Sequence, residues 1–76
     1  MKTRKIKDFA QASLLKAKNM RLERVEWEGN VAYWIFDDSN GEADALIQSF
    51  INREVSVNAS DFWDAQRILK QSIYNK

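Results

Sequence analysis

Residues 27–36, WEGNVAYWIF, decide the fold, because they carry the clearest hairpin signal in the chain. Gly29 and Asn30 separate two runs of alternating side chains, and glycine at the first turn position favours a two-residue type II′ turn. Leu22 falls out of phase with this alternation and predicts a bulge or bend where the first strand begins. The register set by the turn places four large apolar side chains together on one face, where we expect the core: Val25, Trp27, Trp34 and Phe36.

The opposite face of the hairpin is half polar. On it the register pairs Arg24 with Ile35, Glu26 with Tyr33 and Glu28 with Val31. We expect a protein partner, or a second copy of the chain, to contact Val31, Tyr33 and Ile35 and the free outer edge of the second strand. The alternative is an ordinary sheet face that the stems of the charged side chains shield.

Before the hairpin, the sequence predicts a basic arm and a helix. Residues 1–7 are expected to form a flexible arm that carries the cations Lys2, Arg4, Lys5 and Lys7. Asp8 and Gln11 resemble a capping box, which predicts a first helix over about residues 8–18. Asn19 suits a left-handed end for this helix.

After the hairpin, the sequence predicts a second helix and a short third strand. Ser39 and Glu42 form another capping-box pattern, and apolar side chains recur at helical spacing through residues 43–51. Val55 and Val57, on either side of a serine, predict a short strand.

The last helix is predicted over about residues 60–74, with Asn58 or Ser60 as its cap. Its buried stripe is expected to consist of Phe62, Ala65, Leu69 and Ile73. A flank about 100° away combines aromatic and basic side chains, namely Trp63, Arg67, Lys70 and Tyr74. Such a flank, helped by the basic arm, favours nucleic-acid binding through stacking and phosphate contacts. Alternatively, Trp63 closes the edge of the core beneath the stems of Arg67 and Lys70.

Together these elements predict one domain over residues 1–76 with the order α-β-β-α-β-α. The expected fold class is α+β, with a three-stranded mixed or antiparallel sheet and helices packed mainly on one face. The third strand would lie antiparallel to the first strand of the hairpin, at that strand's free edge.

Composition narrows the function classes. The 76 residues include neither His nor Cys, so the usual general base and the usual thiol nucleophile are both missing, and we expect no enzyme. The same absence argues against a zinc site, and no sequence motif implies a metal or any other cofactor. The net charge is +1, but residues 1–24 sum to +6, residues 25–66 to −8 and residues 67–76 to +3. A charged amino terminus without an apolar segment behind it favours a cytoplasmic protein and gives no sign of membrane insertion.

The chain resembles a family of short prokaryotic and phage proteins that is known only as a domain of unknown function. The resemblance lies in Asp8 with Leu14-Leu15-Lys16-Ala17-Lys18, in Trp34-Ile35-Phe36-Asp37-Asp38, and in Val57-Asn58-Ala59-Ser60-Asp61-Phe62 with Ala65, Arg67, Leu69 and Lys70. Asn19 departs from the glycine expected there, although asparagine also tolerates left-handed geometry. The resemblance implies a bacterial or phage origin and supports the order of elements, but it implies no activity and no site residues.

These observations lead to one expectation and one alternative. We expect a small, non-catalytic binding module that contacts a protein partner or self-associates, with no small-molecule ligand implied. The alternative is nucleic-acid binding through the basic arm and the last helix.

Overall fold

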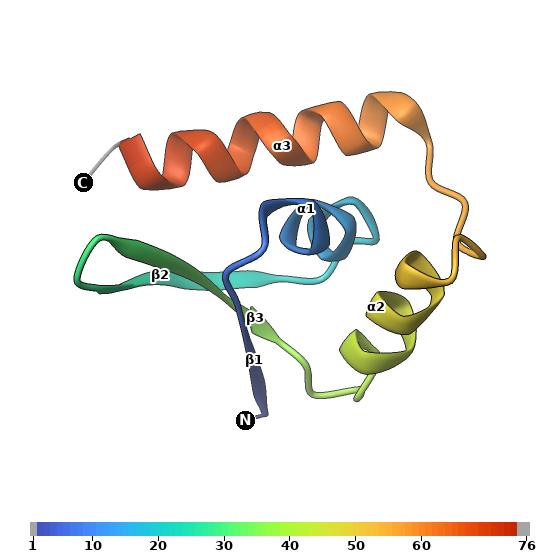
Figure 1. The fold of residues 1–76 in the computed structure, drawn as a ribbon, viewed down its shortest axis with the longest axis horizontal. Coiled ribbons are helices and arrows are strands. Elements are labelled where there is room, and N and C mark those ends of the chain that lie inside the picture. The colour runs from blue at the N-terminus through green and yellow to red at the C-terminus, as the bar shows by residue number, and fades with distance from the viewer. Residues whose placement is uncertain (1, 75–76) are drawn as a thin grey trace.

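The computed structural model describes residues 2–74 and contains six elements in the order β-α-β-β-α-α (Figure 1). The elements are β1 (Thr3–Ile6), α1 (Phe9–Ala17), β2 (Leu22–Glu28), β3 (Val31–Asp37), α2 (Ala43–Ile51) and α3 (Ala59–Tyr74). The α+β class and the three helices are as expected. The predicted order α-β-β-α-β-α is wrong, because the third strand comes first in the chain.

The sheet is antiparallel throughout, with the strand order β1-β3-β2. β1 pairs with the outer edge of β3, and Arg4 lies opposite Phe36. Residues 3–6 are therefore part of the sheet, where the sequence predicted a flexible arm. With only four residues, β1 shows too little alternation to be recognised locally, but it pairs the backbone groups that β3 would otherwise expose.

Residues 55–57, predicted as the third strand, form no strand. They belong to the connection between α2 and α3, where the backbone oxygen of Ser56 accepts a hydrogen bond from Lys18 Nζ at 2.6 Å. The predicted place beside β2 stays unfilled among the described residues, since β1 joins the sheet on the opposite edge.

The hairpin follows the predicted register from the turn to Arg24, which lies opposite Ile35. Gly29 has a φ of +62°, and Asn30 is not among the residues with positive φ, as a type II′ turn requires. The expected irregularity is a bulge between Leu22 and Arg24. It brings Leu22 opposite Phe36, the position that an unbroken register would give to Glu23, and so returns a leucine to the core face.

A side-chain oxygen caps the amino-terminal end of each of the three described helices. Asp8 accepts a hydrogen bond from the backbone N–H of Gln11 at 2.8 Å and begins α1 as predicted. Asn58, one of the two predicted caps of α3, accepts from the backbone N–H of Ser60 at 2.9 Å. At α2 the capping carboxylate comes from Asp38, whose Oδ1 accepts from the backbone N–H of Ala43 at 3.0 Å. Ser39, the predicted cap, instead donates to Asp37.

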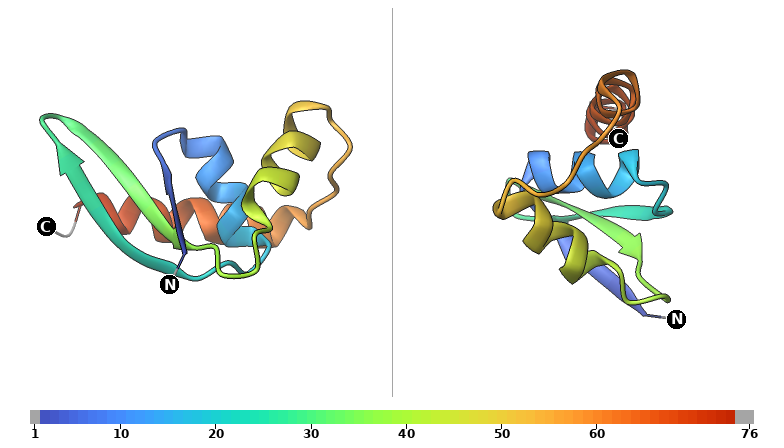
Figure 2. Two further views of the ribbon diagram at one scale, coloured as in Figure 1. Left: turned by 90° about the horizontal axis from the view of Figure 1, so that it is seen from below. Right: turned by 90° about the vertical axis from the view of Figure 1, so that its right-hand side faces the viewer.

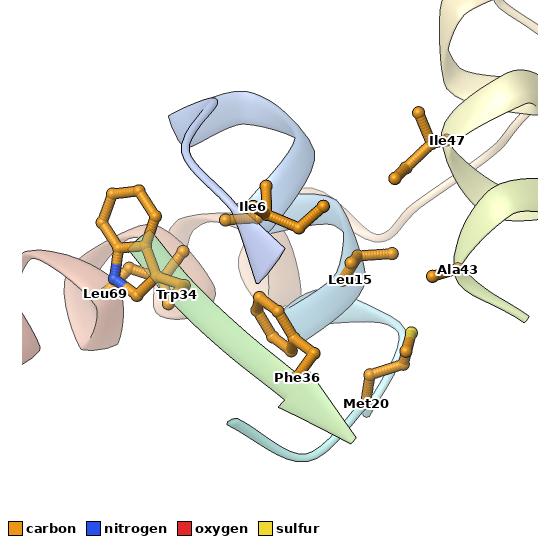
Figure 3. Close-up of a cluster of buried hydrophobic side chains, with 9 residues drawn as sticks. Ile6, Leu15, Met20, Trp34, Phe36, Ala43, Ile47 and Leu69 are labelled. Carbon is orange, nitrogen blue, oxygen red and sulfur yellow. The ribbon is translucent and has the colours of Figure 1, made fainter. Parts of the chain in front are cut away.

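The helices form two layers on the sheet (Figures 1 and 2). α1 lies between the sheet and α3, while α2 closes one end of the core beside α1. Figure 3 shows side chains from β1, β3 and all three helices gathered in one cluster, in which Phe36 and Leu69 are fully buried. Phe9 packs against Trp34 with 5.9 Å between ring centroids, and the indole N–H of Trp34 donates to Ser72 of α3 at 3.0 Å.

One predicted core residue lies at the surface. Trp27 is 41% exposed, whereas Trp34 and Phe36 on the same face are buried. Trp27 lies next to the turn, and the hairpin turn projects beyond α1, so the helical layer does not cover this end of the sheet (Figure 1).

Candidate functional site

The outer sheet face, opposite the helices, was the first predicted contact surface. Ile35 in the central strand is only 3% exposed and is therefore not available to a partner. It lies between Lys5 of β1 and Arg24 of β2, and side chains of this kind can cover an apolar neighbour with their stems. Tyr33 is half-buried, and Val31 remains exposed at the end of the hairpin.

A small charge network shields the same face. Lys5 Nζ forms an ion pair with Glu28 and lies 4.4 Å from the centroid of the Tyr33 ring. The hydrogen bond to Glu28 raises the pKa of Lys5; desolvation opposes this shift, and the charges of Glu28 and Glu26 support it. The outer edge of β3, the other part of the predicted surface, is occupied by β1. These contacts fit a sheet face shielded by charged side chains better than a surface that contacts a partner.

The basic residues near the amino terminus do not form a common arm. Lys5 faces the outer sheet face, whereas Arg4 points to the helical side and forms an ion pair with Asp44 of α2. Lys2 and Lys7 are exposed at the two ends of β1. Pairing within the chain thus engages two of the four cations that were expected to contact phosphates.

The flank predicted on the last helix is present as one surface. Trp63 and Tyr74 are 63% and 78% exposed, and Arg67 and Lys70 lie between them along α3. These four residues, here called the aromatic-basic flank, line a shallow depression of about 230 Å³ together with Gln66 and Gln71.

Helix packing explains why this flank is exposed. Ala65 and Leu69 are buried, and Phe62 and Ile73 are half-buried, as the predicted stripe requires. At about 3.6 residues per turn, the aromatic-basic flank points away from that stripe. α3 is the outermost layer of the molecule, so its outer side meets solvent (Figure 2).

Local contacts organise the flank. The guanidinium carbon of Arg67 lies 5.7 Å from the ring centroid of Trp63, and its Nη2 lies 3.4 Å from Asp64 Oδ1. Lys70 Nζ lies 5.8 Å from the Phe9 ring centroid and so covers the edge of the core. Arg67 lies over Trp63 as the structural alternative predicted, whereas Lys70 lies over Phe9 and Trp63 does not close the core.

Sequence reasoning missed three exposed residues on the rest of the outer surface of α3. Asp61 and Asp64 lie in its first half, and Ile68 is a third exposed position. These three line a depression of about 370 Å³ between α3 and the end of α1, where Lys16 is also found. Asp64 lies three residues before Arg67 of the flank, and Asp61 and Ile68 lie three residues before and four residues after Asp64, so this helical spacing was the signal that would have included them.

A further depression is polar and lies where α1 and β3 end and β2 begins. It measures about 210 Å³ and is lined by residues that include Arg21, Asp37 and Glu42. Hydrogen bonds from the hydroxyl and the backbone N–H of Ser39 lower the pKa of Asp37. Within residues 2–74, no group of three or more His, Cys, Asp or Glu side chains could hold a metal ion.

No helix within residues 2–74 combines the length and the apolar character that spanning a bilayer requires.

Comparisons with known proteins give one match. Residues 1–75 match the model of the family described as Domain of unknown function (DUF5659), and the chain belongs to that family. No curated protein and no solved structure matches the chain.

Proposed function

We propose that this member of a family without a defined activity is a non-catalytic protein-binding module and that the aromatic-basic flank of α3 is its contact surface. The observation that carries the proposal is the exposure of Trp63 and Tyr74 on one side of one helix. A domain of 76 residues has little core to spare, and each large ring left in water forgoes about 2 kcal/mol of burial. A partner that covers the flank would recover that free energy.

The composition of the flank supports a protein partner. Trp, Tyr and Arg are the residues most enriched among the energetically dominant positions of protein interfaces. Arg67 lies against the Trp63 ring, so the two side chains present a partly ordered surface before any partner arrives. The depression beside them offers a place for a side chain of the partner.

The charges favour protein over nucleic acid. Asp61 and Asp64 are exposed beside the flank in the first half of α3 and would repel phosphates. Of the cations expected to bind nucleic acid, Arg4, Lys5 and Arg67 already lie in ion pairs within the chain. We therefore propose a protein partner, and the oligonucleotide titration described below tests whether the flank binds nucleic acid.

We propose neither a catalytic activity nor a cofactor for the chain, because it offers neither His nor Cys for catalysis. The proposal includes a cytoplasmic location in a bacterium or phage-infected cell. A chain without cysteine is compatible with a reducing compartment.

The test compares two variants in a cross-linking capture experiment. Replacing the rings by Trp63→Ala with Tyr74→Ala should abolish capture of the protein partner. The control, Ile51→Ala, removes an equally exposed apolar side chain from α2 and should leave capture unchanged. Equal capture by both variants would refute the contact surface.

A second measurement separates the two classes of partner. Titration with duplex and single-stranded oligonucleotides at low salt should leave the amide NMR spectrum unchanged. Peak shifts that weaken steeply with salt and disappear in Arg67→Ala with Lys70→Ala would replace the protein partner by nucleic acid.

A further inference from the structure

We infer that the occupant of this surface is a second copy of the same chain, with the two α3 helices packed antiparallel. The inference rests on the proposed function, because it uses the same side of the same helix. Its own basis is the order of charges along α3.

Four charged residues follow one another at intervals of three on the exposed side of α3. In order they are Asp61, Asp64, Arg67 and Lys70, and all four are exposed. Residues three apart form a ridge that crosses a helix surface obliquely, so these side chains form one charge ridge with Asp64 and Arg67 at its centre and Asp61 and Lys70 at its two edges. Its first half is acidic and its second half is basic.

Such a ridge is complementary to itself in only one orientation. In a parallel pair, each acidic half would lie against the acidic half of the other copy. In an antiparallel pair, Asp64 of each copy lies near Arg67 of the other at the centre of the contact, while Asp61 and Lys70 lie at the edges of the contact. The opposed helix dipoles favour the same orientation. Two-fold symmetry makes the contact between Asp64 and Arg67 occur twice, as in any isologous interface.

The contacts within one chain leave the ridge available. Asp64 and Arg67 are about half exposed, and 3.4 Å separates their charged atoms. An exposed pair of this kind contributes less than about 1 kcal/mol, so exchanging it for pairs between two copies costs little. The net charge of the chain is only +1, so two copies do not repel each other over long range.

Apolar side chains flank the ridge on both sides and would supply the buried area. Trp63 and Tyr74 lie on one flank and Ile68 on the other, and all three are exposed in the single chain. Trp63 is in the acidic half, so an antiparallel copy would bring its own basic half to that ring. The chain already shows the corresponding contact, with Arg67 over the Trp63 ring.

Charge sums also set this occupant apart from others. The charge ridge carries two acidic and two basic groups, so it offers no net attraction to a polyanion or to a strongly basic protein. A foreign protein would need the reversed order of charges at the same spacing. A second copy has that order by symmetry.

Sedimentation equilibrium tests the inference with two charge variants. The wild-type chain of 8.9 kDa should sediment as a dimer at high micromolar concentration. The cationic variant, Asp61→Lys with Asp64→Lys, and the anionic variant, Arg67→Glu with Lys70→Glu, should each dimerise at least about tenfold more weakly. An equimolar mixture of the two should form dimers again. A monomeric wild type, or a mixture that stays monomeric while both variants remain folded by circular dichroism, would overturn the inference.

A fully reversed variant tests the orientation. With all four charges of the ridge exchanged in sign, the variant should dimerise with itself and should exclude the wild-type chain. Mixed dimers with the wild type would indicate a parallel arrangement and would overturn the antiparallel one. If a lysine or glutamate variant fails to fold, Asp64→Asn and Arg67→Gln replace them, and each should weaken the dimer.

The outcomes separate this inference from the proposed function. A monomeric wild type that captures another protein through Trp63 and Tyr74 would overturn self-association and leave the protein-binding surface in place. A dimer that neither the ring variants nor the charge variants affect would overturn both.

Discussion

The three tryptophans show how position, not residue type, sets the environment of a side chain. Trp34 is buried in the central strand, and its indole N–H donates to Ser72. Trp27, on the same face of the sheet, is 41% exposed, and the turn beside it extends past α1. Trp63 faces away from the core on the outermost helix. The hairpin register predicted Trp34 correctly and Trp27 wrongly as core residues, since the register does not say how far the helical layer reaches.

A prediction at the residue scale concerns Asp37. Its folded-state pKa is lowered, first by the hydroxyl of Ser39, so the stability it contributes is present above its unfolded pKa and lost as pH falls through the folded value. In Ser39→Ala the pKa of Asp37, measured by NMR from its carboxyl carbon, should rise part of the way to the ordinary value. The backbone N–H of Ser39, at 3.0 Å, would still donate.

Ser39→Thr is the matched control for this titration, because it keeps a hydroxyl at the same position. It should leave the pKa of Asp37 close to that of the wild type. An Asp37 that titrates identically in Ser39→Ala and in the wild type would show that the hydroxyl has no such effect.

At the scale of elements, β1 is the largest difference between expectation and structure. Its charged residues read as a solvated arm, yet alternate positions point to opposite faces of the sheet, and Ile6 enters the core. β1 pairs with β3, so β3 becomes the central strand and its backbone groups on that side are not left unpaired. The connection at residues 52–58 forms no strand, and among the described residues nothing pairs with the outer edge of β2, where that strand was predicted.

This assignment predicts unequal effects for two neighbouring substitutions. Ile6→Ala should lower the free energy of unfolding by about 2–5 kcal/mol, because it empties a buried position in the core. Lys7→Ala, at an exposed site, should change it by less than about 0.5 kcal/mol. Urea denaturation measures both. Equal, small changes in the free energy of unfolding for both variants would indicate that residues 3–6 form a flexible arm.

At the scale of the whole molecule, α1 is the layer between the sheet and α3. Its fully buried side chains include Ala12, Leu14 and Leu15. α3 reaches the core beyond α1 through Leu69 and through the hydrogen bond between Ser72 and Trp34. The domain is small enough that we expect these contacts to form and break together.

Leu69 provides the corresponding test. Leu69→Ala should cost about 2–5 kcal/mol and should shift the unfolding transitions seen by tryptophan fluorescence and by far-UV circular dichroism equally. Gln71→Ala, two residues away and exposed, should leave both transitions in place. Separate transitions in Leu69→Ala would mean that α3 detaches while the sheet and α1 remain folded.

The sequence by itself determined the features that depend on neighbours along the chain. These are the hairpin turn at Gly29, its register as far as Arg24, the cap at Asp8, the left-handed end at Asn19, and the spacing that places the aromatic-basic flank on one side of α3. Each follows from backbone sterics or from a short hydrogen-bonded pattern, which operate within a few residues.

Only the tertiary structure decided which segment completes the sheet and which surface remains open. Pairing β1 with β3 is a contact between distant parts of the chain, and its four residues carry too weak a local signal to announce it. The burial of Ile35 follows from that pairing, because Lys5 arrives beside it. The exposure of Trp63 follows from the layering of α3 on α1, since burial depends on what lies across from a side chain, and no local pattern specifies that.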